Sequence, residues 1–285
     1  MPNSIVILTY ERTGSNWLCN ALNSDKVYCA GEIFCDNPLV SYWQFKFLLE
    51  KLCVSSPIIK TFAAIFHQNN FHIDPEQIEN LKTRIKQKNP YSIEFLDAFR
   101  DFVFKLDMSL LYKIFPSHLN ESITIDRIID RSDYVIINYR QNLIETYISY
   151  KKALLYDDWS ITNNRLLEDP DYYSRSKQIT WDDREYLNFC KNILSYLNLW
   201  QQQIEKKPSI VLSYEEIHNS SDKLNKLSSV INNWGLQIPI NTNILYLKQS
   251  QYTNVENNFE NIDDYRKSIK NIPQYITYEN QIFSI

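Results

Sequence analysis

The chain has 285 residues, with 30 Lys and Arg against 34 Asp and Glu, and a formal net charge of −4. Hydrophobic residues make up 44% and charged residues 22%, a globular composition that excludes a wholly disordered chain. The mild negative charge disfavours a general binder of nucleic acid or of anionic membranes. No apolar run reaches the roughly 18 residues of a membrane-spanning helix, and the N-terminus lacks the features of a signal peptide. We therefore expect a cytoplasmic protein.

The numbers of cysteines and glycines further limit the kinds of site and backbone conformation that we expect. The five cysteines are odd in number and form no CxxC pair, so they suggest neither a disulfide framework nor a zinc site, and we expect free, mostly buried thiols. The chain has three glycines, Gly14, Gly31 and Gly235, where average usage would give roughly twenty. We expect such a chain to keep glycine where the backbone requires it.

The first part of the chain has the pattern of an α/β unit. Residues 4–10 form a short apolar, β-branched run, which predicts a buried and central parallel strand. A polar turn over residues 11–15 follows, and then a helix over residues 16–22. Residues 40–108 carry aromatic residues and amphipathic stripes, and we expect them to form a helical insertion that caps the sheet within a single domain, residues 1–285.

Strands and helices alternate in the second half of the chain. Residues 110–115 predict a second strand and residues 134–139 another, which leads into a helix over about 142–155. A long helix from about 184 to 206 then feeds a last strand at 209–214. This alternation predicts an α/β fold, with an open parallel sheet and helices on both of its faces.

The first motif with chemical content is the polar loop within residues 9–17. Between a buried strand and a helix, such a loop directs backbone N–H groups at one spot, where the helix N-terminus adds partial positive charge. Gly14 allows a ligand to approach the backbone, Thr13 and Ser15 offer hydroxyls, and Arg12 offers a charged fork for phosphate or sulfate. The motif predicts an anion-binding loop. The alternative is an ordinary turn in which Ser15 caps the helix.

The second motif comprises residues 138–142, followed by Glu145 and Ser149, and its Arg140 leaves the end of a predicted strand. Ser149 lies nine residues later in the next predicted helix. Ligands of open α/β sheets bind beyond the carboxyl ends of the strands, so we expect Arg140 and Arg12 along the same edge. The alternatives are a surface ion pair for Arg140 and, for Ser149, a hydroxyl bonded to a carbonyl one turn back.

Six segments match, in order, motifs of the PAPS-dependent sulfotransferases, where PAPS is 3′-phosphoadenosine 5′-phosphosulfate. The chain resembles this family, and most of all its bacterial carbohydrate-type branch, which includes the trehalose sulfotransferases. The departures are Arg12, where cytosolic relatives carry lysine, and Tyr112 and Leu111, where phenylalanine and glycine are usual. The matching segments are similar to the 5′-phosphosulfate loop (residues 9–17), the acidic motif (31–34), a Gly-Phe-Lys segment (112–118), the 3′-phosphate motif (139–149), a Tyr-Glu-Asp-Leu segment (213–217) and a cofactor-covering loop (Lys248 and Gln249).

The resemblance implies a P-loop-like fold that transfers a sulfuryl group from PAPS to a hydroxyl of a carbohydrate, glycolipid or small metabolite and releases PAP. In-line transfer would depend mainly on positioning and on neutralising leaving-group charge, with Arg12 at the bridging oxygen and Lys113 as a second cation. No metal is required. The residues assigned to PAPS are Arg12, Thr13, Gly14, Ser15, Asn16 and Trp17 on the 5′ side, Arg140 and Ser149 at the 3′-phosphate, and Lys248, which is otherwise simply solvated.

A general base must accept the proton of the hydroxyl, and there are two candidates. Glu32 follows Gly31 on a predicted loop, and burial beside apolar neighbours would raise its pKa to a useful value. His118 has an ordinary pKa that is already near neutrality. The family's carbohydrate branch favours Glu32, whereas cytosolic relatives use a histidine. The structural alternatives are a solvated carboxylate for Glu32 and a capping role for His118.

Two other functions compete with the sulfotransferase. The first is a nucleotide-dependent kinase of the P-loop type, against which the missing Gly-Lys-Ser/Thr sequence and magnesium aspartate count. The second is a catalytically silent protein that binds PAP. A hydroxyl-bearing small molecule or glycan is the expected partner and nucleic acid is not; a homodimer is left open.

Overall fold

The computed structural model describes residues 2–24, 26–34, 93–105, 107–156, 178–219, 221–235 and 255–270. Within these residues, five strands form one all-parallel open sheet in the order β2-β3-β1-β4-β5. The predicted parallel α/β sheet is therefore confirmed. The strands are β1 (Ser4–Thr9), β2 (Val27–Glu32), β3 (Ser109–Ile114), β4 (Tyr134–Tyr139) and β5 (Ser209–Ser213).

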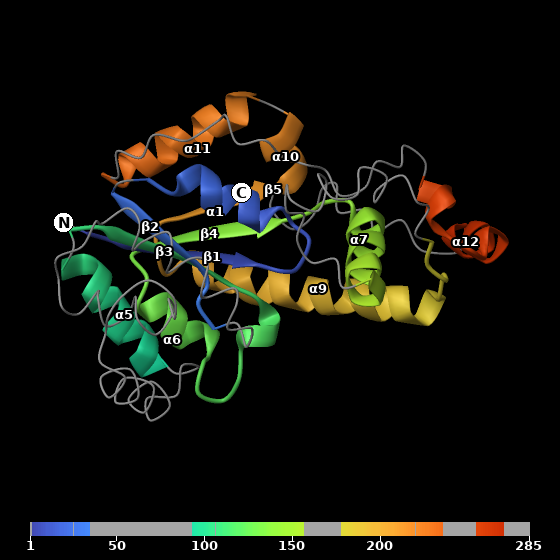
Figure 1. Cartoon of the computed structure of the whole chain (residues 1–285), viewed down its shortest axis with the longest axis horizontal. Coiled ribbons are helices and arrows are strands. Elements are labelled where there is room, and N and C mark those ends of the chain that lie inside the picture. The colour runs from blue at the N-terminus through green and yellow to red at the C-terminus, as the bar shows by residue number, and fades with distance from the viewer. Residues whose placement is uncertain are drawn as a thin grey trace, which may run out of the picture.

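Helices cover both faces of the sheet, as predicted. Figure 1 shows α1 and α11 on one side and α5, α6 and α9 on the other. The helices are α1 (Ser15–Leu22), α5 (Ile93–Lys105), α6 (Ile125–Asp130), α7 (Leu143–Tyr156), α9 (Asp183–Ile204), α10 (Tyr214–Asn219), α11 (Ser221–Asn233) and α12 (Ile262–Ile269), with short 3-10 helices η1 (Pro116–His118) and η2 (Val255–Asn258).

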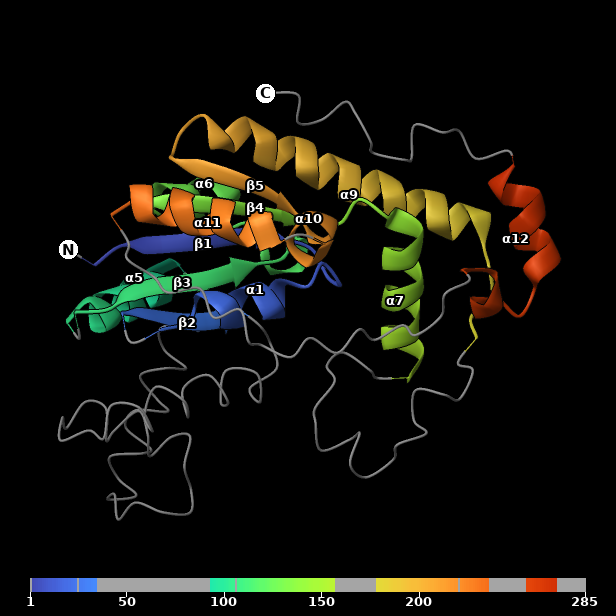
Figure 2. The ribbon, with the colours of Figure 1, turned by 90° about the horizontal axis from the view of Figure 1, so that it is seen from above.

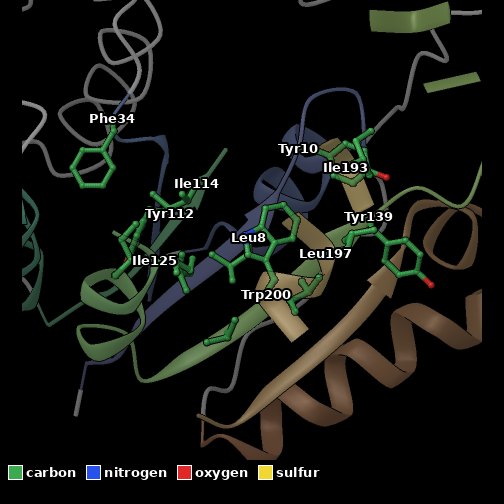
Figure 3. Close-up of a cluster of buried hydrophobic side chains, with 14 of the residues drawn as sticks. Leu8, Tyr10, Phe34, Tyr112, Ile114, Ile125, Tyr139, Ile193, Leu197 and Trp200 are labelled. Atoms are coloured by element: carbon green, nitrogen blue, oxygen red, sulfur yellow. The ribbon is translucent and has the colours of Figure 1, made fainter. Parts of the chain in front are cut away.

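Strand β1 has a separate hydrophobic core on each side. Successive side chains of a strand point to opposite faces, so a central parallel strand must be apolar throughout. Ile5 and Ile7 pack toward α1 and α11, whereas Leu8 joins the opposite core, which includes Trp200 of α9. Figure 3 shows Leu8, Tyr112 and Trp200 in this second core. The two cores fix β1 at the centre of the sheet, and with it the loop that follows.

The sequence prediction missed one strand, β2. It placed Gly31 and Glu32 on a loop after the first helix, whereas they end an edge strand paired with β3. The pairing shifts register between Cys29 and Gly31, and Gly31 has a φ of 58°. This bulge interrupts the apolar alternation that identifies a strand, and glycine adopts its positive φ without strain. The correction matters because it brings Glu32 opposite Lys113.

The helical insertion is described in part. Helix α5 confirms its last segment and buries Ile93, Leu96 and Val103 against the sheet. Residues 35–92 lie outside the described residues, as do Lys248 and Gln249. The single domain stays a prediction. Among the helices of the described ranges, none is long and apolar enough to cross a membrane.

Candidate functional site

The predicted site residues that the structure describes, all except Lys248, lie on elements near the carboxyl edge of the sheet. All five strands run in the same direction, so the loops after β1, β3 and β4 leave from this edge. Figure 2 shows the strands pointing toward α7, which lies beyond this edge. In open α/β sheets this edge is where ligands bind.

The loop after β1 is held in an unusual backbone conformation. Arg12 has a φ of 69° and Gly14 a φ of 75°. For a side chain larger than glycine, such a conformation costs about 1–2 kcal/mol, which the surrounding contacts must offset. Helix α1 begins at Ser15 with Gly14 as its N-cap and without a side-chain cap. The alternative in which Ser15 caps the helix is therefore wrong.

Hydrogen bonds made by Thr13 and Asn138 hold this loop in place. The Thr13 hydroxyl donates to the carbonyl of Tyr10 at 3.0 Å and shares a 2.6 Å hydrogen bond with the Thr9 hydroxyl. The Asn138 amide donates to the Thr13 carbonyl at 3.2 Å and to its hydroxyl at 3.1 Å. Thr13 and Asn138 are both fully buried, so the Thr13 side chain holds the loop and leaves the backbone to face a ligand.

Sequence reasoning included Asn138 in the second motif but gave it no role. The signal was present, because Asn138 is a buried amide in the otherwise apolar strand β4, and buried polar groups need partners.

Arg12 and Ser149 are in contact, although the sequence placed them at opposite ends of PAPS. The Arg12 Nε–H donates to the Ser149 hydroxyl at 2.8 Å. Ser149 belongs to α7, so the bond joins the loop after β1 to the helix that follows β4. The two predicted anion sites are thus parts of one continuous surface.

Two of the four predicted catalytic residues, Lys113 and Glu32, form an ion pair. Their charged groups lie 2.8 Å apart, with the Lys113 side chain 2% exposed and that of Glu32 18% exposed. Lys113 also donates to the Asn16 side chain and lies 4.9 Å from the centre of the Phe115 ring. A buried ammonium needs such partners. The same ammonium neutralises the charge of Glu32 and engages its carboxylate.

Glu11 is a second carboxylate at this edge, and sequence reasoning treated it only as a turn residue. Burial raises the pKa of the Glu11 carboxyl above its usual 4.5, and this effect outweighs the hydrogen bond from Ser117 and the charge of Lys113, which lower it. The Ser117 hydroxyl donates to the Glu11 carboxylate at 3.4 Å. A carboxylate with a raised pKa is the better proton acceptor. The available signal was an acidic residue beside Arg12 directly after a buried strand.

His118 has a structural position. The Phe115 backbone N–H donates to His118 Nδ1 at 3.2 Å, and the two rings pack with centres 5.2 Å apart. A neutral imidazole that accepts at Nδ1 carries its hydrogen on Nε2, so neither nitrogen is ready to accept a proton. This geometry agrees with the capping role that the sequence left open for His118.

Arg140 is buried, with 7% of its surface exposed, so it does not form the surface ion pair considered as its alternative. Its guanidinium forms an ion pair with Glu145, and its Nε lies 3.8 Å from Glu215 Oε1. The Cζ atom of the Arg140 guanidinium lies 4.7 Å from the centre of the Tyr214 ring. The Tyr10 hydroxyl holds the backbone, donating to the Arg140 carbonyl and accepting from its N–H, both at 2.9 Å.

Glu215 holds the loop after β4. Its carboxylate accepts the N–H groups of Gln141 at 2.9 Å and Asn142 at 3.1 Å. Glu215 belongs to the predicted Tyr-Glu-Asp-Leu-like segment, for which the sequence offered no partner. The contact ties that segment to the loop that carries Arg140.

The remaining predicted residues lie on α1. Trp17 is buried in the core beneath α1, and Ser15 is 5% exposed. Asn16 is exposed and contributes to the site through Lys113. No cluster of His, Cys, Asp and Glu in the described part of the chain has the geometry of a metal site. No protein-family model matches this chain, and a comparison with curated proteins finds no match either.

Proposed function

We propose that the chain is a sulfotransferase that uses PAPS as its sulfuryl donor. The observation that carries the proposal is the arrangement of Arg12 and Arg140 on the loops after the neighbouring strands β1 and β4. One arginine contacts α7 through Ser149 and the other precedes α7, so two cationic groups share one edge. A donor with a 3′-phosphate and a 5′-phosphosulfate needs two such groups at separate points.

The chain's own side chains can support in-line transfer. The acceptor oxygen would form a bond to sulfur while the bond from sulfur to the 5′-phosphate oxygen breaks and PAP leaves. Arg12 and Lys113 would stabilise the charge that develops on the leaving oxygen. The hydroxyl proton would pass to a carboxylate, Glu11 or Glu32. Of these two we favour Glu11, because burial raises its pKa and the Glu32 carboxylate is engaged by Lys113.

The acceptor is proposed to be a hydroxyl of a carbohydrate, glycolipid or small metabolite. The carboxylates of Glu11 and Glu32 and the Ser117 hydroxyl are at hand to receive hydrogen bonds from such a molecule. A cytoplasmic location and a homodimer stay predictions.

Calorimetric titration with PAP tests the proposal. We expect PAP to bind the wild type, and Arg140→Ala to weaken binding by at least about tenfold, as expected for a lost charge-assisted hydrogen bond. Arg266→Ala is the control, because it removes the same charge from an exposed ion pair with Glu256. Binding of ATP without binding of PAP would instead support the kinase.

A second experiment separates the enzyme from a silent binding protein. Incubation with sulfur-labelled PAPS and a panel of sugars and small hydroxyl compounds should label at least one acceptor. PAP binding without transfer to any acceptor or to water would favour the silent protein.

A further inference from the structure

Arg140 has two carboxylate neighbours, and they are held in different ways. Glu215 accepts two backbone N–H groups, from Gln141 and Asn142, in addition to its approach to Arg140 Nε. The carboxylate of Glu145 contacts the Arg140 NH2 group, its partner among the described residues. The Glu145 side chain is 32% exposed and that of Glu215 is 24% exposed. Glu215 is therefore anchored, whereas Glu145 can turn into water at the cost of one ion pair.

The Arg140 guanidinium also has unused capacity. Its Nε–H is buried and has no hydrogen-bond partner within the described ranges, because Glu215 lies 3.8 Å away. Buried donors without a partner are uncommon and costly. The Nη2 group of Arg140, which contacts Glu145, is a second donor that an incoming anion would need. Arg140 thus presents a buried positive charge, an Nε–H donor that is unused among the described residues, and an Nη2 donor that is occupied by Glu145.

We propose that Glu145 is the internal counter-ion of Arg140, which an incoming 3′-phosphate must displace in order to bind. The inference rests on the proposed function, in which the 3′-phosphate of PAPS binds Arg140.

Binding then exchanges one anion for another at Arg140. A ligand that displaces Glu145 breaks one ion pair and forms a new one, so Glu145 lowers the affinity for every anion that binds there. A phosphomonoester brings nearly two charges and three acceptor oxygens, enough to engage both Nε and Nη2 of Arg140 and to offset this cost. Because Arg140 is buried, these charges interact more strongly than they would in bulk water.

Titrations of matched ligands test this inference. PAP and AMP differ only in the 3′-phosphate. We expect Glu145→Gln to bind PAP about tenfold more tightly than the wild type, since a competing charge is removed, and to bind AMP within about twofold of it.

Glu215→Gln is the matched control. It removes a carboxylate from the same guanidinium but weakens the contacts with Gln141 and Asn142, so it should lower the melting temperature and not tighten PAP binding. Glu145→Ala provides a second route if the glutamine keeps a hydrogen bond to Arg140, and it should tighten PAP binding in the same direction.

The outcomes separate this inference from the proposed function. If the wild type prefers PAP to AMP and neither Glu145 variant binds PAP more tightly, the inference is wrong and the proposed function stands. If the Glu145 variants bind PAP and AMP more tightly to the same degree, the effect does not arise at the 3′-phosphate and the inference is also wrong. If PAP and AMP bind the wild type equally, the 3′-phosphate is not recognised and both fail.

Discussion

Lys113 and Glu32 lie opposite each other near the ends of β3 and β2, and their charged groups are 2.8 Å apart. The sequence analysis predicted separate roles for these two residues, Lys113 as a cation at the leaving group and Glu32 as a candidate base. It makes the edge of the sheet nearly neutral at this point. Glu11 is a second described carboxylate at this edge, with a raised pKa, and it is our preferred candidate for the proton acceptor.

Removing one member of the ion pair should destabilise the protein strongly. Lys113→Ala leaves the mostly buried carboxylate of Glu32 without its cation, and we expect a loss of about 3–5 kcal/mol in the free energy of unfolding, measured by urea denaturation. Lys206→Ala is the control, since the pair of Lys206 with Asp126 is about half exposed and should contribute below about 1 kcal/mol. Equal effects of the two variants would contradict the buried pair.

Glu11 should give the protein a distinctive dependence of stability on pH. Because its pKa is raised in the folded state, ionisation is harder there than in the unfolded chain. Its contribution is favourable below about pH 4.5 and is lost as pH rises through the folded-state pKa. Glu11→Gln should therefore become more stable relative to the wild type between pH 4 and pH 7. Melting temperatures at both values check this, with the exposed Glu121→Gln as control.

Glu11 should also control the pH dependence of transfer. We expect Glu11→Gln to lower kcat by about 10²–10⁴-fold and to remove the acidic limb of the rate profile, because the proton acceptor is lost. PAP affinity should stay within about twofold, since Glu11 carries no predicted contact to the nucleotide. Glu32→Gln should retain the acidic limb. A profile in which only Glu32→Gln loses that limb would assign the base to Glu32.

Loss of the amide at Asn138 should loosen the loop that carries Arg12. Asn138→Ala removes two hydrogen bonds to Thr13 and leaves the Thr13 carbonyl without this donor, so we expect a loss of about 1–3 kcal/mol in unfolding free energy. PAP binding should weaken as well, because the backbone around Gly14 loses its support. Unchanged PAP affinity at reduced stability would show that Asn138 supports the sheet alone.

The sequence predicted most of the fold because hydrophobic periodicity carries it. The central strands β1 and β4 are largely apolar on both faces, and α9 has a long amphipathic pattern, so the sequence pattern predicted that they are buried. Strand β2 was missed because its bulge at Gly31 breaks the alternation. Local patterns identify elements whose environment is uniform, and β2 at the sheet edge is not one of them.

The site was predicted residue by residue, but its pairings were not. Contacts such as Arg140 with Glu215 or Lys113 with Glu32 join residues far apart in the sequence, and a single sequence has no signal for them. The acidic partners of Lys113 and Arg140 in particular could not be predicted, since the sequence does not distinguish an exposed carboxylate from a buried one. The fold decides which charges meet, and thereby which of them is a base.

The contact between Arg12 and Ser149 yields a test of where Ser149 acts. Ser149→Ala removes the acceptor that holds the Arg12 Nε–H at 2.8 Å, and we expect PAP affinity to fall by about threefold to tenfold. If Ser149 acts through Arg12 on the 5′ side, AMP affinity falls by the same factor as PAP affinity. If Ser149 binds the 3′-phosphate directly, as the resemblance implies, AMP affinity stays unchanged and PAP affinity alone falls. The geometry favours the first outcome, because the hydroxyl of Ser149 is directed at Arg12.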